Sequence, residues 1–67
     1  MSRSLKIDPD RLKAQIIRKG YTLKEVAVEL HYSDQWIYQC MYRGKMSAEG
    51  VEAMERFGIN RRWYVIR

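Results

Sequence analysis

Four stretches of the chain carry apolar residues three or four positions apart, which is the spacing of one buried helix face. The first opens at Asp8-Pro9, where Asp can cap a helix and Pro suits the first helical position, and it closes at Gly20. The second opens with Thr22 and Glu25, which fit a capping box. Its apolar positions are Leu23, Val26, Ala27 and Leu30. We therefore predict one helix between Pro9 and Gly20 and a second over about residues 22–30.

Two serines mark two further helix starts. Ser33 can cap a helix over about residues 34–42. Residues 43–46 are expected to form a connection, after which Ser47 can cap a fourth helix that ends at Gly58. The apolar stripe of this fourth helix is Val51, Met54 and Phe57. Gly50 lies inside it and indicates close backbone packing.

The two ends of the chain have less regular patterns. Trp63-Tyr64-Val65-Ile66 is rich in β-branched and aromatic residues, which favours a short strand, although Asn60 could equally cap a final helical turn. Ser4-Leu5-Lys6-Ile7 alternates polar and apolar residues and could supply the partner strand. The predicted fold class is mainly α: one compact domain of four to five helices over residues 1–67, with or without a short C-terminal β-strand.

The composition limits what such a domain can contain. The chain has 67 residues, a formal charge of +5 and 46% apolar residues, which is ordinary for one small globular domain. A core of this size usually supplies only ~3 to 5 kcal/mol. Because Cys40 and His31 are the sole cysteine and histidine, neither a disulfide nor a Cys/His zinc site can add to that. We therefore expect a homodimer. A lone thiol suits a reducing compartment, and no apolar run is long enough to cross a membrane, so we expect a cytoplasmic protein.

Few side chains in the sequence suit catalysis. His31 is expected in a turn between helices, and Cys40 is expected to face the core, where thiols are inert. Glu49, Glu52 and Glu55 recur on one face of the fourth helix with no histidine near them in sequence, which is typical of a solvated face. We expect no catalytic residue, no metal site and no cofactor.

Two short helices joined by a tight turn, over about residues 22–42, fit a helix-turn-helix. This motif needs a small residue in the middle of its first helix so that the second helix can cross closely, and Ala27 occupies that position. It also needs apolar residues that face the body of the domain. Val26, Leu30, Tyr32, Ile37 and Cys40 can supply them.

Residues 10–59 resemble the phage Cro and lambda-repressor class of DNA-binding domains. The resemblance rests on residues 22–27, on Ser33 followed by Ile37, on residues 43–45 and on residues 57–59. It implies a helical bundle whose third helix enters the DNA major groove, usually in a two-fold dimer, and a repressor of transcription in a phage or another mobile element. A terminal strand would favour the Cro-like end of the class.

Two positions depart from the pattern of that class. His31 stands where the class usually has Gly, so this residue is expected to adopt a positive φ angle. The distance from Ile37 to Gly44 is one residue longer than in the commonest form, so the third helix is expected to be extended or to end differently.

Gln35, Tyr38 and Gln39 are the candidates for reading DNA bases, since they fall on the outward face of the third helix and Gln can bind adenine with two hydrogen bonds. The candidates for the DNA backbone are Thr22, Lys24, Ser33, Tyr42, Arg43 and Lys45, with Arg3, Lys6 and the terminal arginines as further cations. In the tail, Trp63, Tyr64 and Ile66 either contact a second subunit or close the core of the monomer.

A second class of function fits the same helix. Residues 21–42 carry one basic and three acidic side chains, which counts against an interface with phosphates. Interfaces between proteins are enriched in aromatic residues and Met, and the third helix and its surroundings contain Trp36, Tyr38, Met41, Tyr42 and Met46. For Trp36, packing on neighbours competes with contact to nucleic acid. The alternative is therefore a protein-binding module on a helix-turn-helix scaffold, such as a phage-encoded inhibitor or an antitoxin-like partner.

Overall fold

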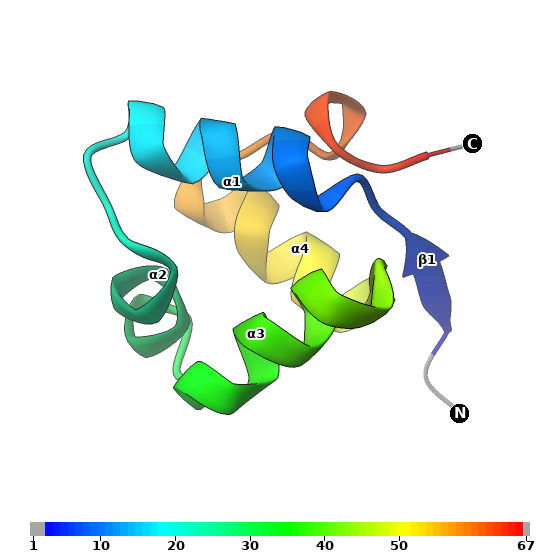
Figure 1. The fold of residues 1–67 in the computed structure, drawn as a ribbon, viewed down its shortest axis with the longest axis horizontal. Coiled ribbons are helices and arrows are strands. Elements are labelled where there is room, and N and C mark those ends of the chain that lie inside the picture. Colours follow the sequence, from blue (N-terminus) through cyan, green and yellow to red (C-terminus); the bar gives the residue numbers. More distant parts are fainter. Residues whose placement is uncertain (1–2, 67) are drawn as a thin grey trace.

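The computed structural model describes residues 3–66, which form four α-helices, a two-stranded antiparallel sheet and one 3-10 turn. Figure 1 shows the helices gathered around one centre, with the first strand at the edge of the bundle. In chain order the elements are β1 (Ser4–Lys6), α1 (Pro9–Arg18), α2 (Leu23–Glu29), α3 (Asp34–Arg43), β2 (Lys45–Ser47), α4 (Ala48–Phe57) and the 3-10 helix η1 (Arg61–Trp63). The mainly α fold class is confirmed.

The predicted helix starts are confirmed because each capping residue makes its expected bond. Asp8 accepts hydrogen bonds from the backbone of Asp10 and Arg11. The other three starts follow the same rule: Thr22 accepts from Glu25 N at 3.1 Å, Ser33 from Trp36 N at 3.2 Å and Ser47 from Gly50 N at 3.1 Å. These bonds satisfy backbone N–H groups that have no partner inside the helix. Local sequence therefore sets where the helices begin.

The third helix ends one residue later than predicted. It continues to Arg43, and Gly44 follows it in the left-handed conformation, with φ at 68°. The longer spacing between Ile37 and Gly44 is thus taken up by helix, which was one of the two expected results.

The strand pairing differs from the prediction. The partner of β1 is β2, with Ser4, Leu5 and Lys6 opposite Ser47, Met46 and Lys45. Residues 45 and 46, expected in a connection, belong to this strand. Of the two alternatives for the tail, the strand over residues 63–66 does not form: η1 covers residues 61–63, and in residues 64–66 Val65 makes a single bridge, to Ile7.

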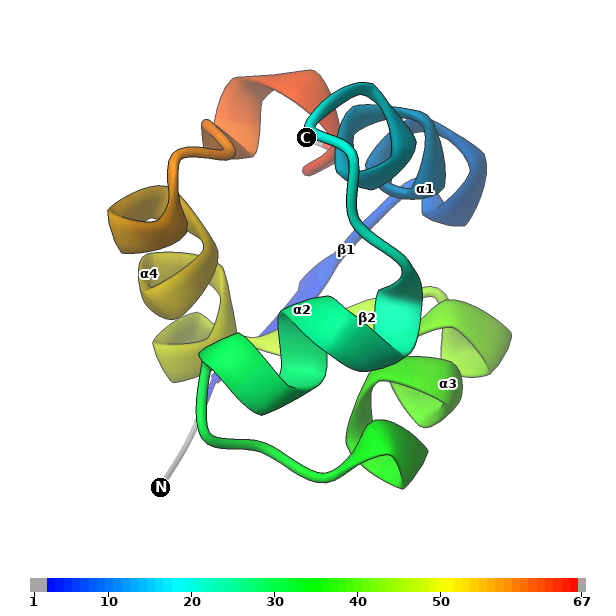
Figure 2. The same cartoon turned by 90° about the vertical axis from the view of Figure 1, so that its left-hand side faces the viewer.

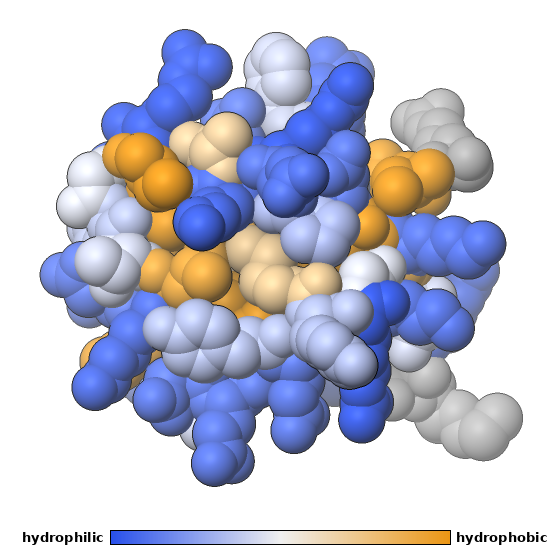
Figure 3. Space-filling view, viewed as in Figure 1, coloured by the Kyte–Doolittle hydropathy of each residue, from blue (hydrophilic) through white to orange (hydrophobic). Residues whose placement is uncertain are grey.

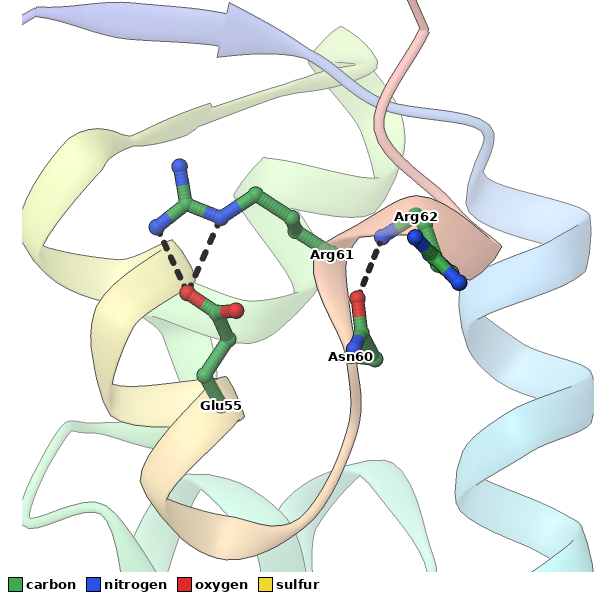
Figure 4. A network of polar contacts seen from close by, with 4 residues as sticks. All are labelled: Glu55, Asn60, Arg61 and Arg62. Atoms are coloured by element: carbon green, nitrogen blue, oxygen red, sulfur yellow. Dashed lines mark hydrogen bonds and ion pairs between the residues drawn. The ribbon is translucent and has the colours of Figure 1, made fainter.

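The alternative, a helical turn capped by Asn60, is confirmed. Asn60 Oδ1 accepts from Arg62 N at 2.9 Å, as Figure 4 shows, and Trp63 N donates to the carbonyl of Asn60. This local capping bond outweighs the strand preference of the following residues. Residues 64–66 then lie along residues 6–8, at the end of β1, because Asp8 N donates to Tyr64 O at 2.7 Å and Ile66 N donates to Lys6 O at 2.8 Å.

The hydrophobic core draws on all four α-helices, on β2 and on single residues next to β1 and η1. Its buried side chains are Ile7, Leu12, Ile16, Val26, Ala27, Ile37, Cys40, Met46, Val51, Met54, Ile59 and Tyr64. In Figure 3, hydrophobic residues lie mainly in a band between α1 and α3, and hydrophilic residues surround this band. No helix in residues 3–66 has the length and hydrophobicity needed to cross a bilayer.

Tyr64 closes this core instead of reaching a second subunit. Its ring is 1% exposed, whereas Trp63 and Ile66 are 54% and 51% exposed. The Tyr64 hydroxyl has no hydrogen-bond partner among the described residues. Of the two roles considered for the tail, Tyr64 therefore fills the structural one, and Trp63 and Ile66 keep surface that another molecule can cover.

Candidate nucleic-acid interface

The turn between α2 and α3 determines how α3 is presented. Figure 2 shows α2 and α3 as neighbours joined by this short loop. His31 has a φ of 65°, as the sequence predicted, and its N–H donates to Val28 O at 3.0 Å. Tyr32 N donates to Ala27 O at 2.8 Å, and the Ala27 side chain is fully buried. Because Ala27 has only a methyl group, it leaves room for α3 to pack closely on α2.

The inner side of α3 is anchored in the core. Ile37 is fully buried and Cys40 nearly so. Burial raises the pKa of the Cys40 thiol, with the nearby Arg43 opposing the shift. The thiol is therefore protonated and a poor nucleophile at neutral pH, in keeping with a packing role.

Trp36 packs against its neighbours, which was one of its two expected roles. Its ring stacks on Tyr32 with centroids 4.0 Å apart and planes 13° apart. A methyl group built at Gly50 would come within 2.7 Å of Trp36 Cζ2 and 2.9 Å of Met46 Cγ. Gly50 thus permits the close backbone packing that the sequence indicated. Through this contact, Trp36 packs the first turn of α3 against α4.

The outer face of α3 is polar and aromatic. Gln35, Tyr38, Gln39 and Tyr42 are all exposed, and Tyr38 and Tyr42 are 51% and 93% exposed. These positions are three or four residues apart, so they form one stripe along the helix. The structure therefore brings the three predicted base-reading residues together on one solvent-facing surface.

A hollow beside the C-terminal half of α3 is lined by several of the residues that the sequence predicted to contact DNA. It is lined by Ser4, Trp36, Gln39, Cys40, Arg43, Lys45, Met46 and Ser47. Gln39 of the outer face thus shares a depression with Arg43 and Lys45, which are two predicted backbone contacts. A side chain with hydrogen-bonding capacity and two cations line the same concave surface, which suits an anionic ligand.

Not every predicted cation lies there. Lys24, on α2, lines a separate hollow with Tyr21, Glu25, Val28 and Glu29. Arg61 forms an ion pair with Glu55, with Nε at 2.9 Å from Oε1, so its charge is already matched, as Figure 4 shows. Arg67, another of the terminal arginines, lies outside the described residues. The predicted set of cations is therefore divided between α2, the region beside α3 and the tail.

The hydroxyl groups of Thr22 and Ser33 serve as helix caps but keep a free proton. Each oxygen accepts one backbone N–H. A hydroxyl can accept and donate at the same time, so both can still donate to a phosphate oxygen. Their predicted contacts with a DNA backbone are compatible with their capping roles.

Two of the three acidic side chains in residues 21–42 accept hydrogen bonds from backbone N–H groups at the start of a helix. Glu25 accepts from Thr22 N at 2.9 Å, and Asp34 accepts from Gln35 N at 3.0 Å. A carboxylate at a helix N-terminus is balanced in part by the positive end of the helix dipole. The helix dipole therefore offsets part of these two charges, while the acidic side chains still oppose a phosphate at the starts of α2 and α3.

The sequence interpretation missed how β1 and β2 complete this surface. Residues 45–47 alternate polar, apolar and polar after Gly44, a pattern that could have indicated a strand. The pairing puts Lys6 directly opposite Lys45. Among residues 3–66, no group of three or more His, Cys, Asp and Glu side chains is arranged to hold a metal ion.

Comparisons with protein-family models, with curated proteins and with solved structures gave no match.

Proposed function

We propose that the chain is a sequence-specific, double-stranded DNA-binding transcriptional regulator of the Cro and lambda-repressor type, and that α2 and α3 are its helix-turn-helix. The observation that carries this proposal is the two-sided character of α3. Its inner side is buried through Ile37 and Cys40, while Gln35, Tyr38 and Gln39 face solvent. A supported helix with an exposed hydrogen-bonding face is what reading a major groove requires.

The dimensions and chemistry of α3 suit that groove. A helix of ten residues is roughly 15 Å long, and the major groove is ~12 Å wide. Gln35 and Gln39 can each bind the edge of an adenine, a contact worth ~1 to 3 kcal/mol against a wrong base. Tyr42, Arg43 and Lys45 lie at the end of α3 and beyond it, where they can reach phosphates.

A homodimer would allow two copies of α3 to read one site. The domain measures 30 × 22 × 22 Å, about the span of one half-site. A two-fold pair would address half-sites ~34 Å apart, one turn of the duplex. The exposed side chains of Trp63 and Ile66 are the candidates for the contact between subunits. Binding of such a pair over a promoter in the cytoplasm would repress transcription by occlusion, as in the phage proteins that the chain resembles.

The test is a titration of the chain with duplex DNA from the regions flanking its own coding sequence, with a scrambled duplex as control and salt varied. We expect preference for one flanking duplex and a log K that falls by ~0.9 per phosphate neutralised as log salt rises. Equal and salt-insensitive affinity for all duplexes would refute the proposal.

Two variants separate base reading from backbone binding. Gln39→Ala is expected to reduce the preference for the specific duplex by about 5- to 150-fold, because a bidentate base contact is lost. Lys45→Ala is expected to weaken specific and scrambled duplexes by the same factor, because phosphates carry no sequence information. If both variants bound every duplex as the parent does, the assignment of these residues would be wrong.

The exposed tyrosines favour a second candidate, a protein-binding module. Tyr38 and Tyr42 offer large apolar surface with polar tips, as interface residues often do. An aromatic protein interface depends far less on salt than a phosphate interface does. The same salt series therefore distinguishes the two functions once a partner is in hand.

A further inference from the structure

The two-stranded sheet places two lysines side by side. In an antiparallel pair, opposite residues alternate between hydrogen-bonded pairs and non-hydrogen-bonded pairs. Ile7 N donates to Gly44 O at 2.9 Å, and Ala48 N donates to Arg3 O at 2.7 Å. Residues 7 and 44, and residues 3 and 48, are therefore hydrogen-bonded pairs.

It follows that Lys6 and Lys45 form a non-hydrogen-bonded pair. The Lys6 carbonyl agrees with this, since it accepts from Ile66 N on the far side of β1. Side chains are closest in pairs of this type, and they project from the same face of the sheet. Leu5 and Met46 occupy the opposite face, where Met46 is buried.

The face that carries the lysines is exposed and has no negative charge of its own. We call it the ribbon face and define it as Ser4, Lys6, Lys45 and Ser47. Residues 3–7 and 43–47 contain Arg3, Lys6, Arg43 and Lys45 and no acidic residue. Within residues 3–66, the ion pairs join Arg11 to Asp8 and Arg61 to Glu55, so neither lysine takes part in one.

Like charges directly opposite each other destabilise a sheet. Lys6 and Lys45 therefore repel each other in the free protein. An anion bound between the two ammonium groups would reduce this repulsion. Three of the four residues of the ribbon face, Ser4, Lys45 and Ser47, also line the hollow beside α3, together with Gln39 and Arg43. An anion bound at Lys45 in this hollow would lie next to α3, the helix that we propose reads the bases.

We propose that the ribbon face binds backbone phosphates of the same duplex that α3 reads, with Lys6 and Lys45 as the paired cations. This inference rests on the proposed function. It adds to the few phosphate contacts that α2 and α3 can make, since Lys24 and Arg43 are the only lysine and arginine in these two helices. It also makes the N-terminal strand a part of the DNA-binding surface.

The test uses the full chain and three variants. Lys6→Gln removes one cation and Lys6→Glu reverses it. Lys13→Glu is the matched control, since Lys13 is an exposed cation within α1 and outside the ribbon. For each protein we would measure affinity for the specific and the scrambled duplex over a range of salt, and the Tm without DNA at low salt.

Lys6→Gln is expected to weaken both duplexes by the same factor and to reduce the slope of log K against log salt by ~0.9, the loss of one phosphate contact. Lys6→Glu is expected to weaken DNA binding further and yet to raise the Tm by about 1 to 5 °C, because it turns a like-charge pair into an opposite-charge pair. Lys13→Glu is expected to leave the slope within about 0.3 of the parent.

A parent slope that Lys6→Gln leaves unchanged would overturn the inference while the proposed function stands. A Tm that falls in Lys6→Glu would also overturn it, because the lysine pair would then not be a source of repulsion. Failure of the parent itself to bind any duplex would refute the proposed function, and that result is distinguishable from the other two.

Discussion

Replacing Gly50 with alanine tests whether the position of α3 depends on contact with α4. Gly50 is buried in the first turn of α4, and an added methyl group would come within 2.7 Å of Trp36 Cζ2 and 2.9 Å of Met46 Cγ. Ordinary contacts of this kind begin near 3.4 Å, so the Trp36 ring would have to move by several tenths of an ångström. Trp36 is adjacent to Gln35, so the same displacement moves a proposed base-reading residue.

Two opposing terms set the size of the effect on stability. Overpacking in a core costs about 1 to 3 kcal/mol. Alanine is better than glycine inside a helix by about 1 kcal/mol. We therefore expect Gly50→Ala to lower the free energy of unfolding by about 0 to 2 kcal/mol, and to lower affinity for the specific duplex more than for the scrambled one.

A double-mutant cycle isolates the contact with Trp36. Urea unfolding would be followed by circular dichroism for the parent, Gly50→Ala, Trp36→Phe and the double variant. Because Phe removes the closer of the two clashes and the Met46 side chain is flexible, the loss caused by Gly50→Ala is expected to shrink by about 1 kcal/mol in the Trp36→Phe background. Glu52→Ala, at an exposed position of α4, is the control and should change stability by less than about 0.5 kcal/mol. A Gly50→Ala protein that is more stable than the parent, or a coupling energy of zero, would show that Trp36 is not held against Gly50.

Substitutions at two other positions, Tyr64 and His31, test the buried hydroxyl in the core and the positive φ angle in the turn. Tyr64→Phe is expected to raise stability in urea by about 1 kcal/mol, because the hydroxyl is buried and has no hydrogen-bond partner within residues 3–66, whereas Tyr42→Phe, at an exposed ring, should have no effect. Burial raises the pKa of Tyr64, with Glu55 adding to the shift and Arg61 opposing it, so the fold favours the protonated hydroxyl. The stability that this preference contributes is complete below pH ~10 and is lost as the pH rises through the higher folded pKa, and the Phe variant should lack that alkaline loss. A destabilised Tyr64→Phe would mean that the hydroxyl is bonded. His31→Gly should keep stability within about 0.5 kcal/mol or raise it, and His31→Val should lower it by more than about 1 kcal/mol, because φ at this position is 65°. Equal stability of the Gly and Val variants in thermal unfolding would contradict that account of the turn.

The helices could be predicted because their signals are local. A capping bond joins residues two or three apart. Ser33 and Ser47 therefore indicate a helix start from the neighbouring sequence alone. The outward face of α3 follows from the same local spacing. Gln35, Tyr38 and Gln39 were therefore placed on the surface correctly, although their contact with DNA stays a prediction.

The strand pairing could not be predicted in the same way. Ser4-Leu5-Lys6-Ile7 has a strand pattern, but the sequence offers two possible partner strands: residues 45–47, with one apolar residue, and residues 63–66, which are all apolar or aromatic. The choice depends on Asn60, which turns the tail into η1, and on Gly44, which ends α3 at the correct point for β2 to begin. The opposition of Lys6 and Lys45 depends on this long-range choice, and so it was missed.

The position of β1 between β2 and residues 64–66 has a consequence for the order of folding. Every backbone bond that β1 and its continuation to Asp8 make with these neighbours spans more than 30 residues of chain. Contacts of such long range form late and slowly, whereas the helices can form early from neighbouring residues. Amide hydrogens of Ile7, Asp8 and Ile66 should therefore exchange with solvent sooner than those inside α4. A polyanion that binds both Lys6 and Lys45 would slow that exchange. Slower exchange of these three amides would therefore reveal a ligand bound outside α3.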